Sequence, residues 1–147
     1  MCIRDSHTPN PSRVFEEIQK YCKPETEIRV MLYSKWSWKV LWIILSYGKG
    51  AFWRADELVR TYSEAQTGCP VTYYYSFRDI RRLMKNFKII EIRKEHIFPY
   101  VIEKYVNYEY KRVWYFRWMP NPLFRLLEKN FGWHTLIVAK IKILEEK

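Results

Sequence analysis

The pattern of apolar and polar positions predicts a helix followed by a strand near the start of the chain. Asn10 and Pro11 form a typical helix start, because an Asn side chain caps the first turn and proline suits the first helical position. Apolar residues then recur at helical spacing until Pro24, which ends the helix. Residues 27–34, EIRVMLYS, are almost continuously apolar. This composition is typical of a strand that is covered on both faces.

Two helices and an irregular segment follow this strand. Ser37 is placed to cap an apolar helix that runs to about Tyr47, and residues 51–62 predict a shorter amphipathic helix. The stretch SEAQTGCPVTYYYS then predicts an irregular segment, since it contains both Gly and Pro. Ser76 caps the next helix, and Asp79 three residues later completes a capping box.

The rest of the chain alternates between strands and helices. Residues 88–97 alternate apolar and polar positions, as a strand does. The aromatic-rich segment 103–118 predicts a helix that Pro120 ends, and a compact helix closed by Gly132 follows. Residues 134–143 predict a final strand. The whole pattern therefore predicts an α/β fold with three strands and helical inserts.

The first strand of this arrangement has no predicted neighbour on one side. A strand that is apolar on both faces needs partners on both edges, so we expect the missing ones to come from upstream of this chain. In this chain alone we expect strand 27–34 to expose an unpaired edge, which promotes aggregation. Residues 1–6, MCIRDS, fit no part of the pattern. We interpret them as a non-native leader and residues 7–147 as the domain.

Composition widens the choice of partners. The formal net charge is +10, with 26 Lys and Arg against 16 Asp and Glu, which favours an anionic partner or a solvated basic surface. Aromatic residues make up 18% of the chain, including seven Trp and twelve Tyr. This excess indicates an aromatic-lined cleft, a surface that contacts lipid, or a heavily aromatic core.

The cysteine pattern argues against a disulfide framework and a zinc site. The three Cys are odd in number and form no CxxC pair, and His7, His96 and His134 have no ligand spacing with them. We therefore expect no metal and a reducing, cytoplasmic location. No signal peptide is visible. The longest apolar stretch, WKVLWIILSYG, is about half the length that a membrane span needs.

Several segments from residue 7 onward stand in an order that is specific to one family. HTPNP, at residues 7–11, precedes the helix SRVFEEIQKYCKP and then the segment EIRVMLYSKWSW. Together they resemble the start of the C-terminal half of a class I S-adenosylmethionine-dependent methyltransferase, from the loop after its fourth strand to the loop after its fifth. Residues 76–87 then resemble its last major helix, and residues 88–97 and 134–143 resemble its sixth and seventh strands, so the resemblance covers nearly the whole chain after residue 6. Members often carry a His-Thr-Pro-like run in the first loop and end the helix in Lys-Pro-Gly-Gly, where this chain has Glu25 and Thr26 for the two glycines.

The resemblance implies a Rossmann-like sheet whose last strand lies antiparallel in the middle. We therefore expect strand 134–143 to pair with both 27–34 and 88–97. The resemblance also implies S-adenosylmethionine as cofactor, held in this family by a Gly-rich turn and an acidic strand end. This chain has only four Gly, and the GKG at 48–50 follows a helix rather than a strand. We expect the chain to carry the substrate-side half and to bind the cofactor poorly by itself.

The candidate cleft residues follow from the position of the strand ends, since ligands of open α/β sheets bind beyond the carboxyl ends of the strands. The residues at those ends, with two from the insert that roofs the substrate in this family, are His7, Thr8, Tyr33, Ser34, Lys35, Trp36, Gln66 and Tyr74. Each has a structural alternative: Tyr33 and Trp36 also suit core packing. His96 is a candidate general base only if it reaches the cleft. No residue is assigned as catalytic.

Two functional hypotheses remain open from the sequence. The first is a fragment of a methyltransferase that binds a small-molecule substrate, which the aromatic inserts favour as apolar or membrane-derived. Methyl transfer needs two centres held in line and shielded from water more than it needs an acid or base. The second is a basic, aromatic-rich peripheral binding module. Residues 108–118, YEYKRVWYFRW, suit contact with a membrane interface or, less well supported, stacking with nucleic-acid bases.

Overall fold

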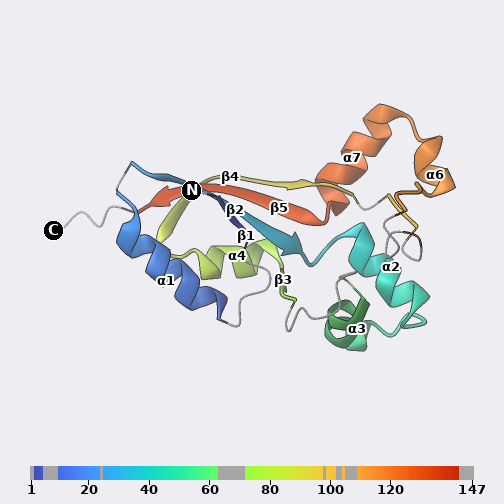
Figure 1. Cartoon of the computed structure of the whole chain (residues 1–147), viewed down its shortest axis with the longest axis horizontal. Coiled ribbons are helices and arrows are strands. Elements are labelled where there is room, and N and C mark those ends of the chain that lie inside the picture. The colour runs from blue at the N-terminus through green and yellow to red at the C-terminus, as the bar shows by residue number, and fades with distance from the viewer. Residues whose placement is uncertain are drawn as a thin grey trace.

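The computed structural model describes residues 2–4, 10–23, 25–62, 72–97, 99–101, 104 and 109–142. Within these residues the chain has a mixed α/β fold with six α-helices, one short 3-10 helix and one mixed sheet (Figure 1). The strands are β1 (Cys2–Arg4), β2 (Glu27–Ser34), β3 (Tyr74–Tyr75), β4 (Phe87–Glu95) and β5 (His134–Ile141). The helices are α1 (Pro11–Tyr21), α2 (Trp38–Ser46), η1 (Phe52–Arg54), α3 (Ala55–Tyr62), α4 (Phe77–Leu83), α6 (Trp114–Arg117) and α7 (Asn121–Phe131).

The last strand lies in the middle of the sheet, as predicted. The main path of the sheet runs β1-β2-β5-β4, and β5 is antiparallel to both of its neighbours. Tyr33 of β2 faces His134, and Lys94 of β4 faces Thr135. The expected pairing of the three long strands is therefore confirmed. A bulge interrupts the ladder of β4 around Ile90, whose side chain is 54% exposed.

The prediction of only three strands is wrong, because two short strands pair with the other edge of β2. β1 runs parallel to β2 with Ile3 opposite Val30, and β3 runs parallel to its end with Tyr33 opposite Tyr74. The expectation of an unpaired edge is also wrong, since β2 has partners on both sides. β1 belongs to the predicted leader 1–6, and its non-native origin stays a prediction.

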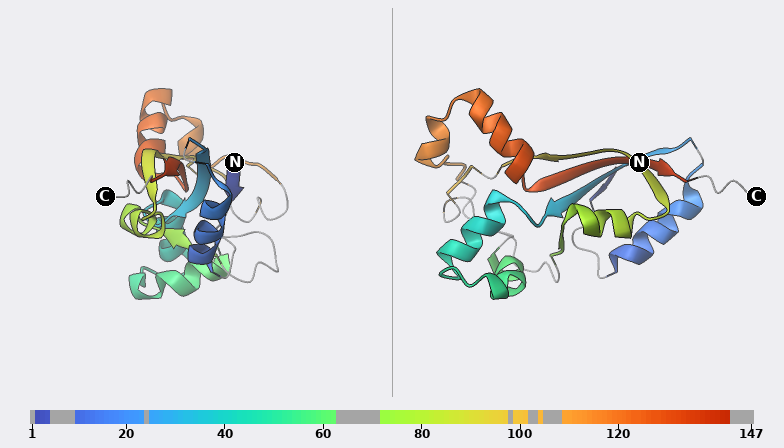
Figure 2. Two further views of the ribbon diagram at one scale, coloured as in Figure 1. Left: turned by 90° about the vertical axis from the view of Figure 1, so that its left-hand side faces the viewer. Right: turned by 180° about the vertical axis from the view of Figure 1, so that it is seen from behind.

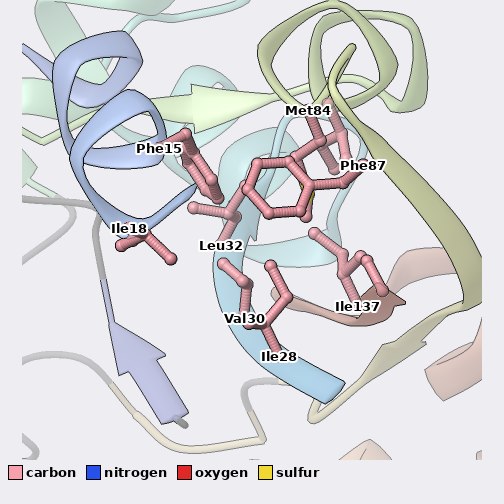
Figure 3. Close-up of a cluster of buried hydrophobic side chains, with 10 residues drawn as sticks. Phe15, Ile18, Ile28, Val30, Leu32, Met84, Phe87 and Ile137 are labelled. Carbon is pink, nitrogen blue, oxygen red and sulfur yellow. The ribbon is translucent and has the colours of Figure 1, made fainter. Parts of the chain in front are cut away.

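The main core fills one face of the sheet. Ile28, Val30 and Leu32 point from β2 toward α1 and α4, which cover this face together (Figures 1 and 3). Phe15 of α1 and Phe87 of β4 meet edge to face above them, with ring centroids 6.1 Å apart. The remaining buried members of the cluster are Ile18, Ile80, Met84, Ile137 and Ala139.

The expectation that β2 is covered on both faces holds only for its last residues. Its first half alternates, with Glu27 and Arg29 exposed, whereas every residue from Leu32 to Ser34 is buried. Helices α2 and α3 cover the other face at this end of the strand. Val40 and Ile44 of α2 and Val59 of α3 pack there with Tyr33 of β2. Trp133, in the turn before β5, belongs to the same separate cluster. α2, α3, α6 and α7 all gather at this end of the sheet (Figure 2).

Local capping signals mostly determine the helices as predicted. Ser37 accepts a hydrogen bond from the backbone of Val40, and Ser76 and Asp79 form a complete capping box at the start of α4. Asn10 caps α1, because its side chain accepts a hydrogen bond from the backbone amide of Arg13. The predicted helix 103–118 is wrong for residues 109–113, although Lys104 is helical. Arg112 instead forms an isolated bridge with Tyr100, and residues 109–113 lead into the single helical turn of α6.

Candidate functional site

A small apolar pocket lies beyond the carboxyl end of β2. We call this cavity of about 260 Å³ the β2 pocket. Its walls are Lys35, Trp36, Ser37, Val40, Leu41, Ile44, Phe52, Ala55, Tyr74 and Phe131. The loop after β2, helices α2 and α7, η1, the start of α3 and strand β3 thus all contribute. Apart from Lys35 and Ser37, the described lining residues are apolar or aromatic, so the pocket suits an apolar ligand group.

Backbone hydrogen bonds fix the loop that forms one wall of the β2 pocket. The amide of Ser34 donates to the carbonyl oxygen of Trp133 at 2.7 Å, and the amide of Lys35 donates to that of Tyr75 at 2.9 Å. Ser37 then starts α2 as its N-cap. The loop is therefore held from both neighbouring strands, while the Trp36 side chain remains 69% exposed.

The Lys94 side chain links two segments that line the β2 pocket, without being one of the lining residues itself. It lies on β4 and is only 9% exposed, and its ammonium donates to the carbonyl oxygens of Trp36 at 2.6 Å and Asn130 at 2.8 Å. Burial lowers the pKa of Lys94. Because Asn130 precedes Phe131, the lysine ties the loop after β2 to the end of α7.

Tyr74 presents its ring to the β2 pocket while its hydroxyl is used elsewhere. The Tyr74 hydroxyl donates a short hydrogen bond to the Asp56 carboxylate. Burial, and next the bond to Asp56, raise the pKa of Tyr74 well above its ordinary value, so the phenol stays protonated. The ammonium of Lys35 lies 5.7 Å from the Tyr74 ring centroid, within range of a cation–π contact.

The structure brings three of the eight predicted cleft residues together. Lys35, Trp36 and Tyr74 line the β2 pocket. Tyr33 and Ser34 are buried behind this wall, at 7% and 2% exposure. The other predicted residues, His7, Thr8 and Gln66, lie outside the described residues.

Tyr33 belongs to a column of stacked rings instead of to the pocket wall. Its ring stacks on Trp133 at 4.4 Å and on His134 at 5.7 Å, and His134 stacks in turn on His96 at 5.1 Å. The Lys39 ammonium lies 4.8 Å from the Trp133 ring at the other end. The column packs β2 against the start of β5, so Tyr33 is a core residue here.

His96 is exposed by its accessible surface and does not line the β2 pocket. Its backbone is left-handed, with φ of 61°, and its amide donates to the Glu128 carboxylate at 3.1 Å. Burial lowers the pKa of His96 below 6.5, Lys39 lowers it further, and Glu128 opposes both. The folded protein therefore favours a neutral imidazole.

This pKa predicts an acid-sensitive contribution of His96 to stability. Because the folded-state pKa lies below the unfolded value, the unfolded chain takes up the proton first, and stability falls as the pH drops below about 6.5. We expect the free energy of unfolding to fall less steeply below this pH in His96→Asn, in which asparagine tolerates the left-handed backbone. Urea denaturation at several pH values measures both slopes. Equal slopes would show that His96 is not shielded.

Three pocket features were not found from the sequence. Phe52 and Phe131 complete the aromatic wall, and Lys94 supports it, but each comes from a segment far along the chain from residue 35. Phe131 carried one indirect signal, since it directly precedes the Gly132 that ends α7. Lys94 carried none, because an ammonium in an alternating strand is usually on the exposed face.

A second cavity lies between α1 and α4. This groove of about 570 Å³ has the core residues Phe15 and Phe87 in its lining and charged side chains of both signs, such as Glu16 and Arg82. Tyr74 borders both cavities. Of the predicted cleft residues that the structure describes, only Tyr74 lines the groove, whereas three line the β2 pocket, so the β2 pocket is the better candidate for the site.

Metal and membrane features complete the description of the candidate site. In the described part of the chain, no three His, Cys, Asp or Glu side chains are grouped to hold a metal ion. No helix among the described residues has the length and apolar character to cross a bilayer. A scan against models of protein families and a search of curated proteins both found no match.

Proposed function

We propose that this chain supplies the substrate-side half of an S-adenosylmethionine-dependent methyltransferase. In this proposal the β2 pocket holds an apolar part of a small-molecule methyl acceptor. The Gly-rich turn and the acidic strand end that bind the cofactor in the resembled family come from sequence upstream. The observation that carries the proposal is the antiparallel β5 between β2 and β4.

The arrangement of the remaining elements supports this assignment. The resemblance requires a fifth strand flanked by a parallel fourth strand on one edge and the antiparallel last strand on the other. β2 has β5 on the antiparallel side. β1, on its other edge, belongs to the predicted leader 1–6, so only the β5 side supports the assignment. α1 and α4, which correspond to the helices before and after the fifth strand and its insert, lie together on one face of the sheet, as in a doubly wound fold (Figure 1).

The chemistry of the β2 pocket also supports this assignment. Methyl transfer from a sulfonium is an in-line displacement, so the protein contributes chiefly by orienting the acceptor and excluding water. Trp36, Phe52 and Tyr74 offer aromatic walls for this purpose. The hydroxyl of Tyr74 is engaged by Asp56, and among the described lining residues Lys35 carries the charge. We assign these residues to substrate orientation and none to proton transfer.

Cofactor binding by a longer chain tests the proposal. We expect the protein extended by its upstream coding sequence to bind S-adenosylhomocysteine in isothermal titration calorimetry, and the 147-residue chain to give no comparable heat. The Trp36→Ala variant of the extended protein is the matched control. It should keep the cofactor affinity, because Trp36 is assigned to the acceptor side. No binding by the extended protein would rule out the methyltransferase assignment.

A further inference from the structure

α7 is an amphipathic helix, but none of its side chains is buried in the core. It carries Leu123, Phe124, Leu126, Leu127 and Phe131, yet no residue of α7 is buried. Leu126 is 58% exposed and Leu123 is 46% exposed. An apolar stripe on a surface helix normally faces a core. The stripe on α7 is therefore left without a full partner within the described part of the chain.

α6 extends this surface with two tryptophans. Trp114 and Trp118, the C-cap, are four positions apart, so they lie on one side of the helical turn, and Arg117 lies beside them. They are 75% and 83% exposed. Phe116 points the other way, is buried, and meets Phe124 of α7 edge to face at 5.9 Å. This contact joins α6 and α7 into one unit, residues 114–131, which we call the α6–α7 arm.

The arm stands out from the end of the sheet, away from the core under α1 and α4 (Figures 1 and 2). Its last residue, Phe131, also forms part of the wall of the β2 pocket. The exposed aromatic and aliphatic surface of the arm thus runs up to the candidate site. A partner that covers the arm also lies close to the pocket.

Charge favours an anionic partner for this surface. The arm holds three basic side chains, Arg117, Arg125 and Lys129, against one acidic one, Glu128, and the described residues just before it add Lys111 and Arg112 against Glu109. All five basic residues are exposed. Glu128 is already engaged, since it accepts hydrogen bonds from the Arg125 side chain at 2.9 Å and from the His96 amide. A second copy of the chain is disfavoured, because each copy carries a net charge of +10.

We propose that the α6–α7 arm docks in the interface of an anionic lipid bilayer. Tryptophan is the side chain best suited to the headgroup region, where its ring is partly buried and its N–H stays wet. Leu123 and Leu126 enter the acyl boundary, and the flanking Arg and Lys contact anionic headgroups. The proposal does not depend on methyltransferase activity, because lipid binding is a property of this chain. It adds a lipid-facing position for the β2 pocket.

Vesicle flotation with the 147-residue chain tests the proposal. We expect the chain to float with vesicles made of equal parts of phosphatidylcholine and phosphatidylserine, and to stay unbound with pure phosphatidylcholine. Trp118→Ala should weaken binding by about tenfold, because the variant loses the apolar area that the bilayer covers. Arg117→Gln should weaken it by about fivefold. Raising the salt concentration should weaken binding of the unchanged chain.

Matched controls separate the arm from the rest of the basic surface. Tyr21, on α1 at the other side of the molecule, is 83% exposed like Trp118, and Arg81 is an exposed arginine of α4. Tyr21→Ala and Arg81→Gln should leave vesicle binding unchanged. Equal losses in the controls and the arm variants would overturn the assignment to the arm. Tighter binding to a single-stranded RNA than to the anionic vesicles would overturn the choice of lipid as the partner.

Discussion

Replacing Lys94 with methionine is expected to lower the free energy of unfolding by about 2 kcal/mol. The methionine keeps most of the apolar stem but cannot donate to the carbonyl oxygens of Trp36 and Asn130, which the lysine reaches at 2.6 and 2.8 Å. Both carbonyl oxygens are partly shielded from water, so water molecules replace the lost ammonium only incompletely. Urea denaturation followed by circular dichroism measures the change.

A second lysine of the same strand provides the control for this substitution. Lys88 is exposed, so Lys88→Met should change stability by less than about 0.5 kcal/mol. The Lys94 variant should also loosen the loop after β2, which hydrogen exchange at the amide of Lys35 reports. Equal stability of the two methionine variants would refute the bridging role of Lys94.

The sequence predicted the elements that depend on local signals. The caps at Asn10, Ser37 and Ser76 use side-chain oxygens within three residues of the amides they satisfy, so they are readable from a short window. The antiparallel place of β5 is a long-range property. It was predicted from the order of segments in a resembled family, because no periodicity tells one strand where another lies.

The short strands beside β2 could not be predicted in this way. β3 has two residues and β1 three, and neither length shows an alternation. The sequence places Tyr74 and Tyr75 in an irregular segment, because they follow a stretch that contains Gly and Pro. They form a strand because the backbone N–H and C=O groups at the edge of β2 need hydrogen-bond partners, and the loops bring this segment beside that edge.

The aromatic segment before α6 shows where helical spacing misleads. Aromatic residues occur so often between 103 and 118 that some fall at helical intervals by chance. In the structure the amide of Val101 bonds to the carbonyl of Lys111, and that of Val113 bonds to the carbonyl of Pro99. Hydrogen bonds between residues 99–101 and residues 111–113 thus satisfy backbone groups that a helix would have paired internally. β-branched and aromatic residues favour this extended form.

The candidate site was predictable only where it follows a strand end. Lys35 and Trp36 come directly after β2, and the rule for open α/β sheets places such residues at the ligand. Phe131 and Lys94 reach the same place through the pairing of β4 with β5, which brings the end of α7 beside the loop after β2. Residues that meet only through tertiary pairing leave no local pattern.

Substituting Gly132 with alanine is expected to cost about 3 kcal/mol of stability, because overpacking against backbone atoms cannot relax easily. A Cβ at this position would lie 2.6 Å from the carbonyl oxygens of both Glu128 and Glu95. Gly132 joins α7 to the turn before β5. The next amide, that of Trp133, donates a hydrogen bond to the carbonyl oxygen of His96. Thermal unfolding should show a decrease in Tm of about 10 °C.

Gly50→Ala separates this steric effect from ordinary glycine flexibility. Gly50 has a φ of 85°, but a Cβ there would meet no atom within 4 Å. Its substitution should therefore cost only about 1 kcal/mol, the strain of a left-handed residue. Gly132 has an ordinary φ of −58°, so backbone strain predicts no loss there and the close approach of two carbonyls predicts a large one. A larger loss in Gly50→Ala than in Gly132→Ala would mean that β4 and the end of α7 are not packed this closely.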